Sequence, residues 1–188
     1  MPLTLLLGIV SFDKNKKEIT VISASPAKGT DTMLTENCTP EDNIIKVKDA
    51  STWKTTGSTY IAFETDPDLK DLPNYNYTFS EIESITQKNG YWEIKLKNLC
   101  GKDFQEGTKV RQHLNGNTYV YVVNTQILPG RDWQSAEGII NGVSDSSFTP
   151  FNIKNLRPGT AFVKIAIIGT PSNKFLFKNI NFSLYKTK

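Results

Sequence analysis

Four side chains suited to binding or proton transfer lie close together in the chain. Arg111 and His113 are two residues apart. Tyr119 and Tyr121 have the same spacing, with Val120 between them. Because successive side chains of a β-strand point to opposite faces, each pair lies on one face of its strand. If the two strands form a hairpin, the Tyr rings can stack on a sugar while Arg and His bind its hydroxyl or carboxylate groups. The spacing therefore predicts a ligand-binding ribbon.

Two loops offer further aromatic rings. Trp133 lies in a Pro-Gly-Arg-Asp-Trp-Gln segment, which is typical of a loop, and Asp132 and Gln134 flank it. This Trp is either a platform for a sugar or a plug at the end of the core. Tyr75 and Tyr77 lie in a connection rich in Pro and Asn, which favours an exposed loop. They form either an adaptable binding surface or, with one ring packed down, an anchor for the loop.

The same ribbon raises the question of catalysis. Polysaccharide lyases use Tyr or His to remove a proton beside a uronate carboxylate, and Arg, Asn or Gln to neutralise that carboxylate. Arg111, His113 and Tyr119 are of these types, but Gln112 is expected on the opposite face of its strand. Glycoside hydrolysis needs two facing carboxylates, whose separation is not set by the sequence. We therefore assign no catalytic residue and favour a non-enzymatic function.

The inventory of residues excludes several classes of protein. The chain of 188 residues has one His and two Cys, too few for a zinc site of four Cys, of two Cys and two His, or of three His. Its formal charge of +3 is too small to favour nucleic acid as a partner. Residues 1–94 carry 9 basic and 14 acidic side chains, whereas residues 95–188 carry 13 and 5. This asymmetry reflects two differently solvated faces or a C-terminal half that binds an anionic partner.

The pattern of apolar residues predicts an all-β protein. Short runs rich in Val, Ile, Thr, Tyr and Phe alternate with turn signals, and no long segment has a helical period. We expect strands at residues 3–12, 18–23, 44–48, 59–64, 79–87, 91–97, 108–113, 118–124, 138–143, 161–168 and 175–185. Asn-Gly pairs at 89–90 and 115–116 predict hairpin turns. Trp92, Ile94 and Leu96 alternate with charged residues, so we expect them in the core.

The remaining features bear on location and stability. The apolar run at residues 1–12 is too short to span a membrane, so we expect a strand there and no membrane span. Cys38 and Cys100 either form one disulfide, which would close a loop of about 60 residues, or stay reduced and buried. We expect Trp53, which follows an Asp-Ala-Ser-Thr segment, to anchor the fold rather than bind a ligand.

Two stretches resemble parts of carbohydrate-active proteins. Residues 43–113 resemble a small β-domain found beside carbohydrate-active modules, through Ile44-Ile45-Lys46-Val47, Trp92-Glu93-Ile94-Lys95-Leu96 and Gly107-Thr108-Lys109-Val110. Residues 116–186 resemble the second half of a jelly-roll carbohydrate-binding module, through residues 117–123, Trp133, residues 138–142, Arg157-Pro158-Gly159-Thr160 and residues 175–180. The resemblance covers most of the chain and rests on residues of the core pattern.

The resemblance implies a jelly-roll β-sandwich formed by residues 1–42 and 114–188, into which residues 43–113 are inserted as a small antiparallel β-domain. It implies a secreted or cell-surface module that is monomeric and binds a polysaccharide without cleaving it. Such a module targets a larger enzyme to which it is covalently linked. The alternatives are a polysaccharide lyase of the jelly-roll type and a structural domain of a phage tail fibre or surface adhesin, which would form trimers or larger oligomers.

Modules of this family often hold a structural calcium ion. The chain offers Asp13, Glu18 and Asn179 where the family has acidic residues near the ion. The resemblance therefore implies Ca²⁺ as the cofactor to look for, with these three residues as ligands. An amide at position 179 weakens such a site, because calcium prefers carboxylate oxygens.

Overall fold

The computed structural model describes residues 3–116, 119–127, 133, 135, 137–140, 142–143, 155–169, 176, 178–181 and 183. Nearly all secondary structure within these residues is strand, which confirms the predicted all-β fold class. The elements in chain order are β1 (Leu3–Phe12), α1 (Val21–Ala24), β2 (Thr32–Met33), β3 (Ile44–Val47), β4 (Thr59–Phe63), β5 (Ile82–Gln87), β6 (Trp92–Leu96), β7 (Lys109–Leu114), β8 (Val120–Ile127) and β9 (Phe162–Gly169). No helix in the described part of the chain is long and apolar enough to cross a membrane.

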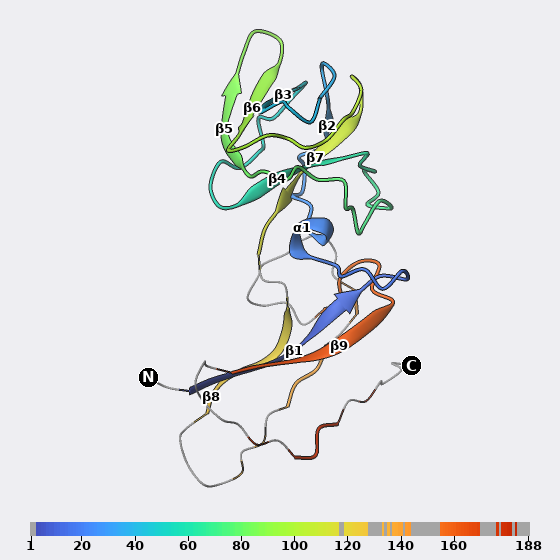
Figure 1. The fold of residues 1–188 in the computed structure, drawn as a ribbon, viewed down its shortest axis with the longest axis vertical. Helices are drawn as coiled ribbons and strands as arrows, with labels where there is room; N and C mark the ends of the chain where they lie inside the picture. Colours follow the sequence, from blue (N-terminus) through green and yellow to red (C-terminus); the bar gives the residue numbers. More distant parts are fainter. Residues whose placement is uncertain are drawn as a thin grey trace.

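The described strands form three antiparallel sheets of three strands each (Figure 1). The first sheet has the order β8-β1-β9, the second β2-β7-β4 and the third β3-β6-β5. In Figure 1 the first sheet lies below α1, and the second and third sheets lie above it. The chain thus leaves the first sheet after β1, builds the other two sheets, and returns to the first sheet at β8.

β1, where the apolar run predicts a strand, is the central strand of the first sheet. Ile9 pairs with Val120 on β8 and with Ile165 on β9. Ile9 and Val120 are each only 2% exposed. The pairing of β1 with β8 shifts register at Gly8, where a Cβ atom would collide with the carbonyl of Val120. Gly8 therefore permits the close approach of the two strands.

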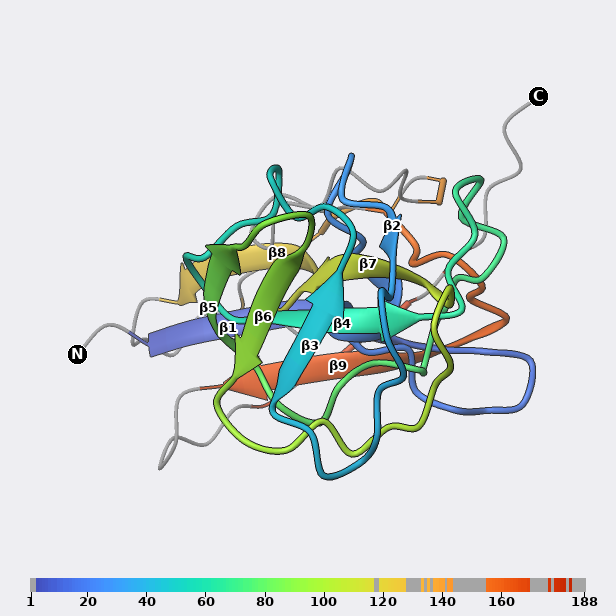
Figure 2. The ribbon, with the colours of Figure 1, turned by 90° about the horizontal axis from the view of Figure 1, so that it is seen from above.

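The second and third sheets share one apolar core, and Figure 2 shows the third sheet lying over the second. Ile61 and Phe63 on β4 are fully buried, as are Ile94 and Leu96 on β6. The ring of Phe63 stacks on that of Phe104, with centroids 4.5 Å apart. Side chains from two sheets thus fill one interior, which gives this part of the molecule the character of a β-sandwich.

Several local predictions are confirmed in these two sheets. β5 pairs with β6 across a tight turn in which Gly90 adopts a φ of 90°, as the Asn-Gly pair predicts. Trp92 is half-buried and packs against the core beside the fully buried Ile94. Trp53 is 7% exposed, and its Nε1 donates a hydrogen bond to the carbonyl of Thr30 at 2.9 Å. Alternation of apolar and charged residues was therefore a sound guide to this core.

The predicted hairpin of residues 108–113 and 118–124 is wrong. β7 pairs with β4 and β2 in the second sheet, whereas β8 pairs with β1 in the first. β4 offers β7 a continuous register from Thr59 to Phe63, and β1 offers β8 an apolar strand from Leu3 to Ile9. Pairing with these distant strands gives β7 and β8 ladders of backbone hydrogen bonds that leave no place for the hairpin.

Three other strand predictions differ from the structure. Residues 18–23 contain part of α1, because the hydroxyl of Thr20 accepts a hydrogen bond from the N–H of Ser23 at 3.2 Å and caps the helix. The described residues within 138–143 and 175–185 are not assigned to strands. In the first of these segments Val143 forms an isolated bridge, which pairs it with Leu156.

The chain joins the second sheet earlier than the predicted boundary at residue 43. Thr32 and Met33 form β2 and pair with β7. Cys38 then forms an isolated bridge with Phe104. Contacts of the second and third sheets therefore reach back across that boundary. The inserted domain and the jelly-roll connectivity stay predictions.

We call the region between the first and second sheets the junction, and define it as residues 13–25, 66–78, 111–113 and 157–160. Its segments are tied together by backbone hydrogen bonds, for example from the N–H of Asn74 to the carbonyl of Ser23 at 2.7 Å. Residues 157–160 form a tight turn with Pro158 in its second position and Gly159 at a φ of 77° in its third. Gly159 lies directly against Pro73, so the junction connects segments far apart in sequence.

Candidate functional site

Arg111 and His113 lie inside the junction. Their exposed fractions are 1% and 0%. Nη2 of Arg111 donates to the carboxylate of Asp71 at 2.8 Å, and Nη1 donates to the carbonyl of Asp66 at 3.1 Å. The carboxylate of Asp31 lies 3.6 Å from the same guanidinium. Both predicted ligand residues are therefore enclosed by the protein, and Arg111 is committed to internal partners.

His113 is held as a neutral imidazole. Nε of Arg111 donates to its Nε2 at 3.2 Å, and its Nδ1 lies against the carbonyl of Ile22, which can only accept. The proton of the ring is therefore on Nδ1. Burial lowers the pKa of His113 to about 4, the charge of Arg111 adds to this effect, and the Ile22 carbonyl opposes it. Such a His stabilises the junction and is not placed to remove a proton from a ligand.

Gln112, on the opposite face of β7, is buried as well. Its Nε2 donates to the carbonyl of Lys54 at 2.7 Å, and its Oε1 accepts from the N–H of Lys54 at 2.9 Å. A polar strand normally indicates a solvated surface, so the sequence pattern misleads at residues 111–113. Asp66 and Asp71 precede Arg111 by 45 and 40 residues, a separation that carries no signal in the sequence.

Tyr119 and Tyr121 lie in the first sheet region, apart from Arg111 and His113. Their ring centroids are 6.0 Å apart, with the planes tilted by 50°. Both side chains are half-buried, whereas Val120 between them is 2% exposed. Val120 therefore points into the interior, on the opposite face of the strand from the two Tyr. The structure keeps the two Tyr together but separates them from the predicted basic partners.

Trp133 is exposed, with 57% of its surface open to solvent. The ammonium group of Lys178 lies over its ring, 4.2 Å from the centroid. Of the two readings of this Trp, the exposed platform matches the structure better than the core plug. Asp132 and Gln134, predicted beside it, lie outside the described residues.

Tyr75 and Tyr77 are half-buried in the 66–78 segment of the junction. The hydroxyl of Tyr75 donates to the carboxylate of Asp13 at 3.1 Å, and the ammonium of Lys17 lies 3.7 Å from its ring centroid. Tyr77 packs edge-on against Tyr60, with centroids 6.2 Å apart. Burial, followed by the hydrogen bond to Asp13, raises the pKa of Tyr75. Both rings thus help to anchor the loop.

The residues predicted to bind calcium do not fit such a site as arranged here. One oxygen of Asp13 accepts from the N–H groups of Asn15 and Lys17, at 2.9 and 2.8 Å, and the other accepts from a Tyr hydroxyl. Glu18 is exposed, and its charge acts on the buried Arg157. Asn179 is also exposed. Among the described residues, no cluster of three or more His, Cys, Asp and Glu side chains is arranged to hold a metal ion.

Phe79 is a candidate ligand residue that the sequence pattern did not single out. Its ring is 74% exposed and lies on Gly101, where a Cβ atom would collide with the ring. The N–H of Phe79 donates to the carbonyl of Cys100 at 3.1 Å, which holds the two backbones side by side. Leu99 is 56% exposed, and the ammonium of Lys102 lies 4.9 Å from the ring centroid. We call Phe79, Leu99, Gly101 and Lys102 the Phe79 platform.

No spacing in the sequence points to the Phe79 platform. Phe79 begins a predicted strand, where an aromatic residue normally indicates a core position. Its exposure follows from the pairing of residues 79–81 with residues 97–100, which places Gly101 beneath the ring. Gly101 has a φ of 66°, a conformation that favours glycine. The sequence around Gly101 does not predict this conformation.

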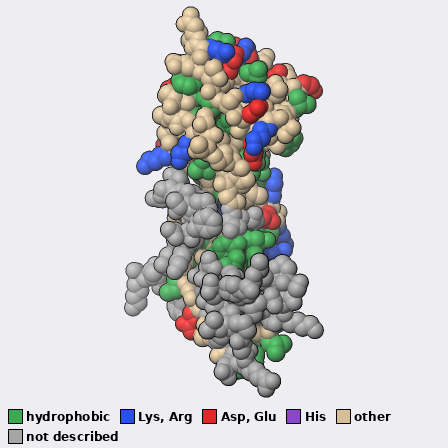
Figure 3. All heavy atoms as spheres, turned by 90° about the vertical axis from the view of Figure 1, so that its left-hand side faces the viewer, with side chains coloured by type: hydrophobic (Ala, Val, Ile, Leu, Met, Phe, Trp, Pro, Cys, Tyr) green, Lys and Arg blue, Asp and Glu red, His purple; other side chains and the backbone are tan. Residues whose placement is uncertain are grey.

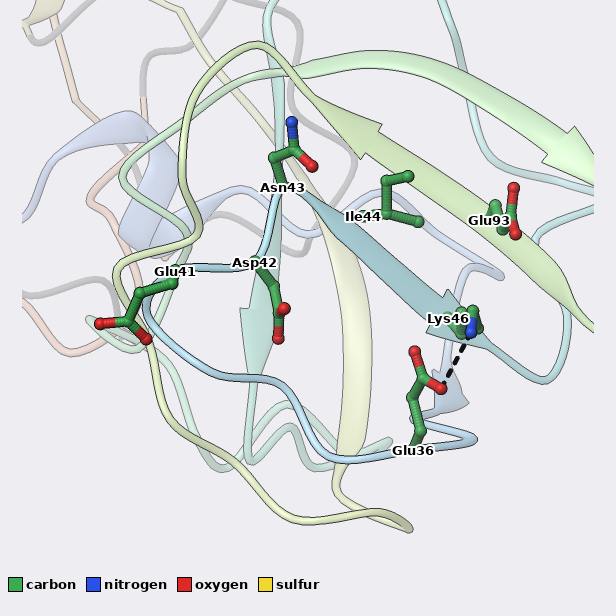
Figure 4. Close-up of a pocket in the computed structure, with 7 residues that line it drawn as sticks. All are labelled: Glu36, Glu41, Asp42, Asn43, Ile44, Lys46 and Glu93. Carbon is green, nitrogen blue, oxygen red and sulfur yellow. Dashed lines mark hydrogen bonds and ion pairs between the residues drawn. The ribbon is translucent and has the colours of Figure 1, made fainter.

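A polar hollow of about 400 Å³ lies beside β3 (Figure 4). Its lining residues are Glu36, Glu41, Asp42, Asn43, Ile44, Lys46 and Glu93. Lys46 is paired with Glu36 at 3.0 Å, and Asp42 accepts hydrogen bonds from Thr39. Four carboxylates against one ammonium make the hollow acidic, so it would repel an anionic ligand.

The outer surface of the third sheet is covered by ion pairs. Lys95 pairs with Glu83 at 2.9 Å, and Lys88 pairs with Glu93 at 3.2 Å. Figure 3 shows basic and acidic side chains interspersed over the part of the molecule that holds the second and third sheets. This surface is well solvated and carries paired charges, in contrast to the Phe79 platform.

The described residues thus offer two exposed rings with a neighbouring ammonium group: Phe79 with Lys102, and Trp133 with Lys178. The predicted ribbon is divided between the buried junction and the first sheet. No family model matches this chain, and no curated protein or solved structure matches it.

Proposed function

We propose that this chain is a non-catalytic domain that binds an acidic polysaccharide, with Phe79 as the ring on which a sugar stacks. Lys102 would bind the carboxylate of that sugar. Trp133 and Lys178 form a second pair of the same kind. We further propose that the domain is secreted or displayed at the cell surface and targets a larger enzyme to its substrate. The observation that carries the proposal is the exposed ring of Phe79, which lies on the backbone of Gly101 with the ammonium group of Lys102 beside it.

The surroundings of Phe79 distinguish it from an apolar residue that is merely exposed. Single exposed apolar side chains are common on protein surfaces. The Phe79 ring, however, lies on the backbone of Gly101 and has an ammonium group beside it. An aromatic side chain has only two rotatable bonds, so it loses little conformational entropy when a sugar stacks on its ring. The C–H face of a pyranose supplies the apolar surface that such a ring needs.

The lysine beside each ring favours an anionic sugar over a neutral one. An exposed contact between an ammonium group and a ring is worth only about 0.5–1 kcal/mol, so Lys102 can leave the ring for a carboxylate at little cost. Lys102 and Lys178 both belong to the half of the chain that carries 13 basic and 5 acidic residues. A uronate carboxylate would receive a charge-assisted hydrogen bond from either lysine.

The proposal assigns no catalytic step. Two of the groups that suggested a lyase, Arg111 and His113, are buried and bonded to one another, and Arg111 is also bonded to Asp71. Neither can reach a polysaccharide on the surface without disruption of the junction. The third, Tyr119, is half-buried in the first sheet region, apart from both.

Affinity electrophoresis of the purified chain against neutral and uronate-containing polysaccharides tests the proposal. We expect at least one uronate polymer to retard the chain more than its neutral counterpart does, with retardation that weakens as salt is added. Ultraviolet absorbance of unsaturated products, followed in parallel, should stay flat. Absence of retardation by every polymer would contradict the proposal, and new absorbance would contradict its non-catalytic part.

A pair of lysine variants tests the role of charge. Lys102→Gln should weaken retardation by uronate polymers, because it removes the ammonium beside Phe79. Lys70→Gln is the matched control, since Lys70 is an exposed lysine that is paired with Asp68 at 3.0 Å and contacts no ring among the described residues. Equal retardation of both variants would remove Lys102 from the site.

A further inference from the structure

We infer that Cys38 and Cys100 are joined by a disulfide bond in the mature protein. Their sulfur atoms lie 3.2 Å apart, and the two residues are separated by 62 positions in the chain. Both side chains are buried, at 2% and 0% exposure. A disulfide requires a sulfur separation of about 2.05 Å, so small rotations of the two side chains are enough to form the bond.

The backbones around the two cysteines are already held in place. The N–H of Cys38 donates to the carbonyl of Phe104 at 2.8 Å, and Phe104 returns a hydrogen bond to Cys38 at 2.9 Å. The N–H of Cys100 donates to the carbonyl of Asp42 at 2.7 Å, and that of Gly101 to Pro40 at 3.0 Å. Four backbone hydrogen bonds thus pair segment 38–42 with segment 100–104. The cross-link would form without movement of either segment.

The bond forms by thiol–disulfide exchange, in which either cysteine can react first, because either sulfur can donate to the other. The first thiolate attacks a disulfide of the oxidant, for example oxidised glutathione, and releases one thiol. The thiolate of the other cysteine then attacks the sulfur of the first and releases the second thiol. One protein disulfide forms and one oxidant disulfide is reduced to two thiols, with the two protons of Cys38 and Cys100 retained in the released thiols.

The bond would cross-link the part of the molecule that holds the second and third sheets. Cys38 lies between β2 and β3, and Cys100 follows β6. A cross-link between positions so far apart restricts the unfolded chain strongly and therefore favours the folded state. Because both sulfurs are buried, exchange with the oxidant takes place while the chain folds or when segment 38–42 opens. This inference does not rest on the proposed function.

The test uses the full chain refolded from denaturant, once with a mixture of reduced and oxidised glutathione and once with a phosphine reductant. After refolding with glutathione we expect an intact mass lower by two hydrogen atoms and no reaction with iodoacetamide under denaturing conditions. The melting temperature should exceed that of the reduced chain by about 5 to 10 °C. Two alkylated cysteines after both treatments, or glutathione attached to either cysteine, would overturn the inference.

Cys38→Ala separates the bond from the packing of the buried cysteines. This variant should melt at the same temperature after either treatment, even if its stability is lower than that of the wild-type chain. Cys100→Ala serves the same purpose from the other side and guards against a variant that fails to fold. A melting temperature that responds equally to glutathione in the wild-type chain and in a variant would assign the effect to something other than this bond.

Discussion

The sandwich of the second and third sheets and the junction below it are held together by different physics. The sandwich is closed by apolar side chains such as Phe63 and Ile94, which are fully buried and need no specific partner. The junction buries Arg111, Gln112 and His113, each of which needs hydrogen bonds that other segments supply. Burial of polar groups therefore makes the junction sensitive to the loss of one partner and to pH, whereas the sandwich responds mainly to lost volume.

The largest expected effect comes from removal of the buried guanidinium. Arg111→Leu should lower the free energy of unfolding by about 3–5 kcal/mol, because it leaves the Asp71 carboxylate, 9% exposed, without its positive partner. The double variant Arg111→Leu/Asp71→Asn should regain part of this stability, since it lacks the unpaired carboxylate. Urea unfolding of the two single variants and of the double variant measures the coupling energy between the two sites.

The matched change in the sandwich is Phe63→Ala. It should cost a similar amount, about 3–5 kcal/mol, through a cavity beside Phe104. For the additivity control, Ile94→Ala on the third sheet is used, because Phe63 and Asp71 both accept a hydrogen bond from Asn74. The cost of Ile94→Ala should be additive with that of Asp71→Asn. If the stability losses of Arg111→Leu and Asp71→Asn were also additive, the two residues would not depend on one another, and the contrast between the junction and the sandwich would be wrong.

A second large effect is a pH dependence that belongs to the junction alone. His113 has a pKa of about 4 when folded, against about 6.5 in the unfolded chain, so the unfolded chain binds the extra proton first as pH falls. The contribution of His113 to stability is therefore full above about pH 6.5 and is lost progressively toward pH 4. The difference of pKa corresponds to at most about 3 kcal/mol.

Unfolding free energies of the wild-type chain and of His113→Gln, measured between pH 7.5 and pH 4, isolate this effect. The Gln side chain can still accept a hydrogen bond from Arg111 but does not titrate. The wild-type curve should fall more steeply than that of the variant between about pH 6.5 and pH 4. Parallel curves would show that His113 is not held neutral in the folded protein.

A smaller effect is expected at the edge of the sandwich. Gly101→Ala and Gly57→Ala both place a side chain at positive φ, at 66° and 82° respectively. Both should lose about 1–2 kcal/mol of stability for that reason. The added Cβ meets the Phe79 ring at position 101 and open space at position 57. On the proposed function, only Gly101→Ala should therefore weaken retardation by a uronate polymer. Equal retardation of Gly101→Ala and Gly57→Ala would show that the Phe79 ring does not contribute to binding.

The smallest effect is expected for the ion pairs on the third sheet. Lys95 and Glu83 pair at 2.9 Å, with 49% and 46% of their side chains exposed. Because water and salt screen such a pair, Lys95→Ala should change stability by less than about 1 kcal/mol. If urea unfolding showed a larger loss of unfolding free energy for Lys95→Ala, surface ion pairs would contribute to the stability of the sandwich along with its apolar core.

The sequence predicted the sandwich better than the junction for a physical reason. Alternation of apolar residues identifies a face that avoids water, and Ile94 and Leu96 lie on such a face as expected. The partners of Arg111 and His113 are set by folding, since Asp71 and Ile22 lie 40 and 91 residues away. No local pattern distinguishes a buried polar strand of this kind from an exposed one.

The residues of the candidate site were only partly found from the sequence. An exposed platform was one of two alternatives for Trp133, and Trp133 is 57% exposed. Phe79 was not expected, because its exposure depends on Gly101, which is brought beneath it by strand pairing and a positive φ. The pairing of Tyr119 and Tyr121 with Arg111 and His113 failed because β7 and β8 belong to different sheets. Neighbouring strands in sequence need not be neighbours in space.

Titration of Phe79→Ala with the uronate polymer that retards the wild-type chain most is the most direct test of the proposed function. The matched control is Leu176→Ala, because Leu176 is 84% exposed and Phe79 is 74% exposed. We expect Phe79→Ala to lower the affinity by about tenfold or more, by analogy with other stacked rings, and Leu176→Ala to leave it unchanged. Wild-type affinity in a folded Phe79→Ala variant would contradict the claim that this ring carries the binding.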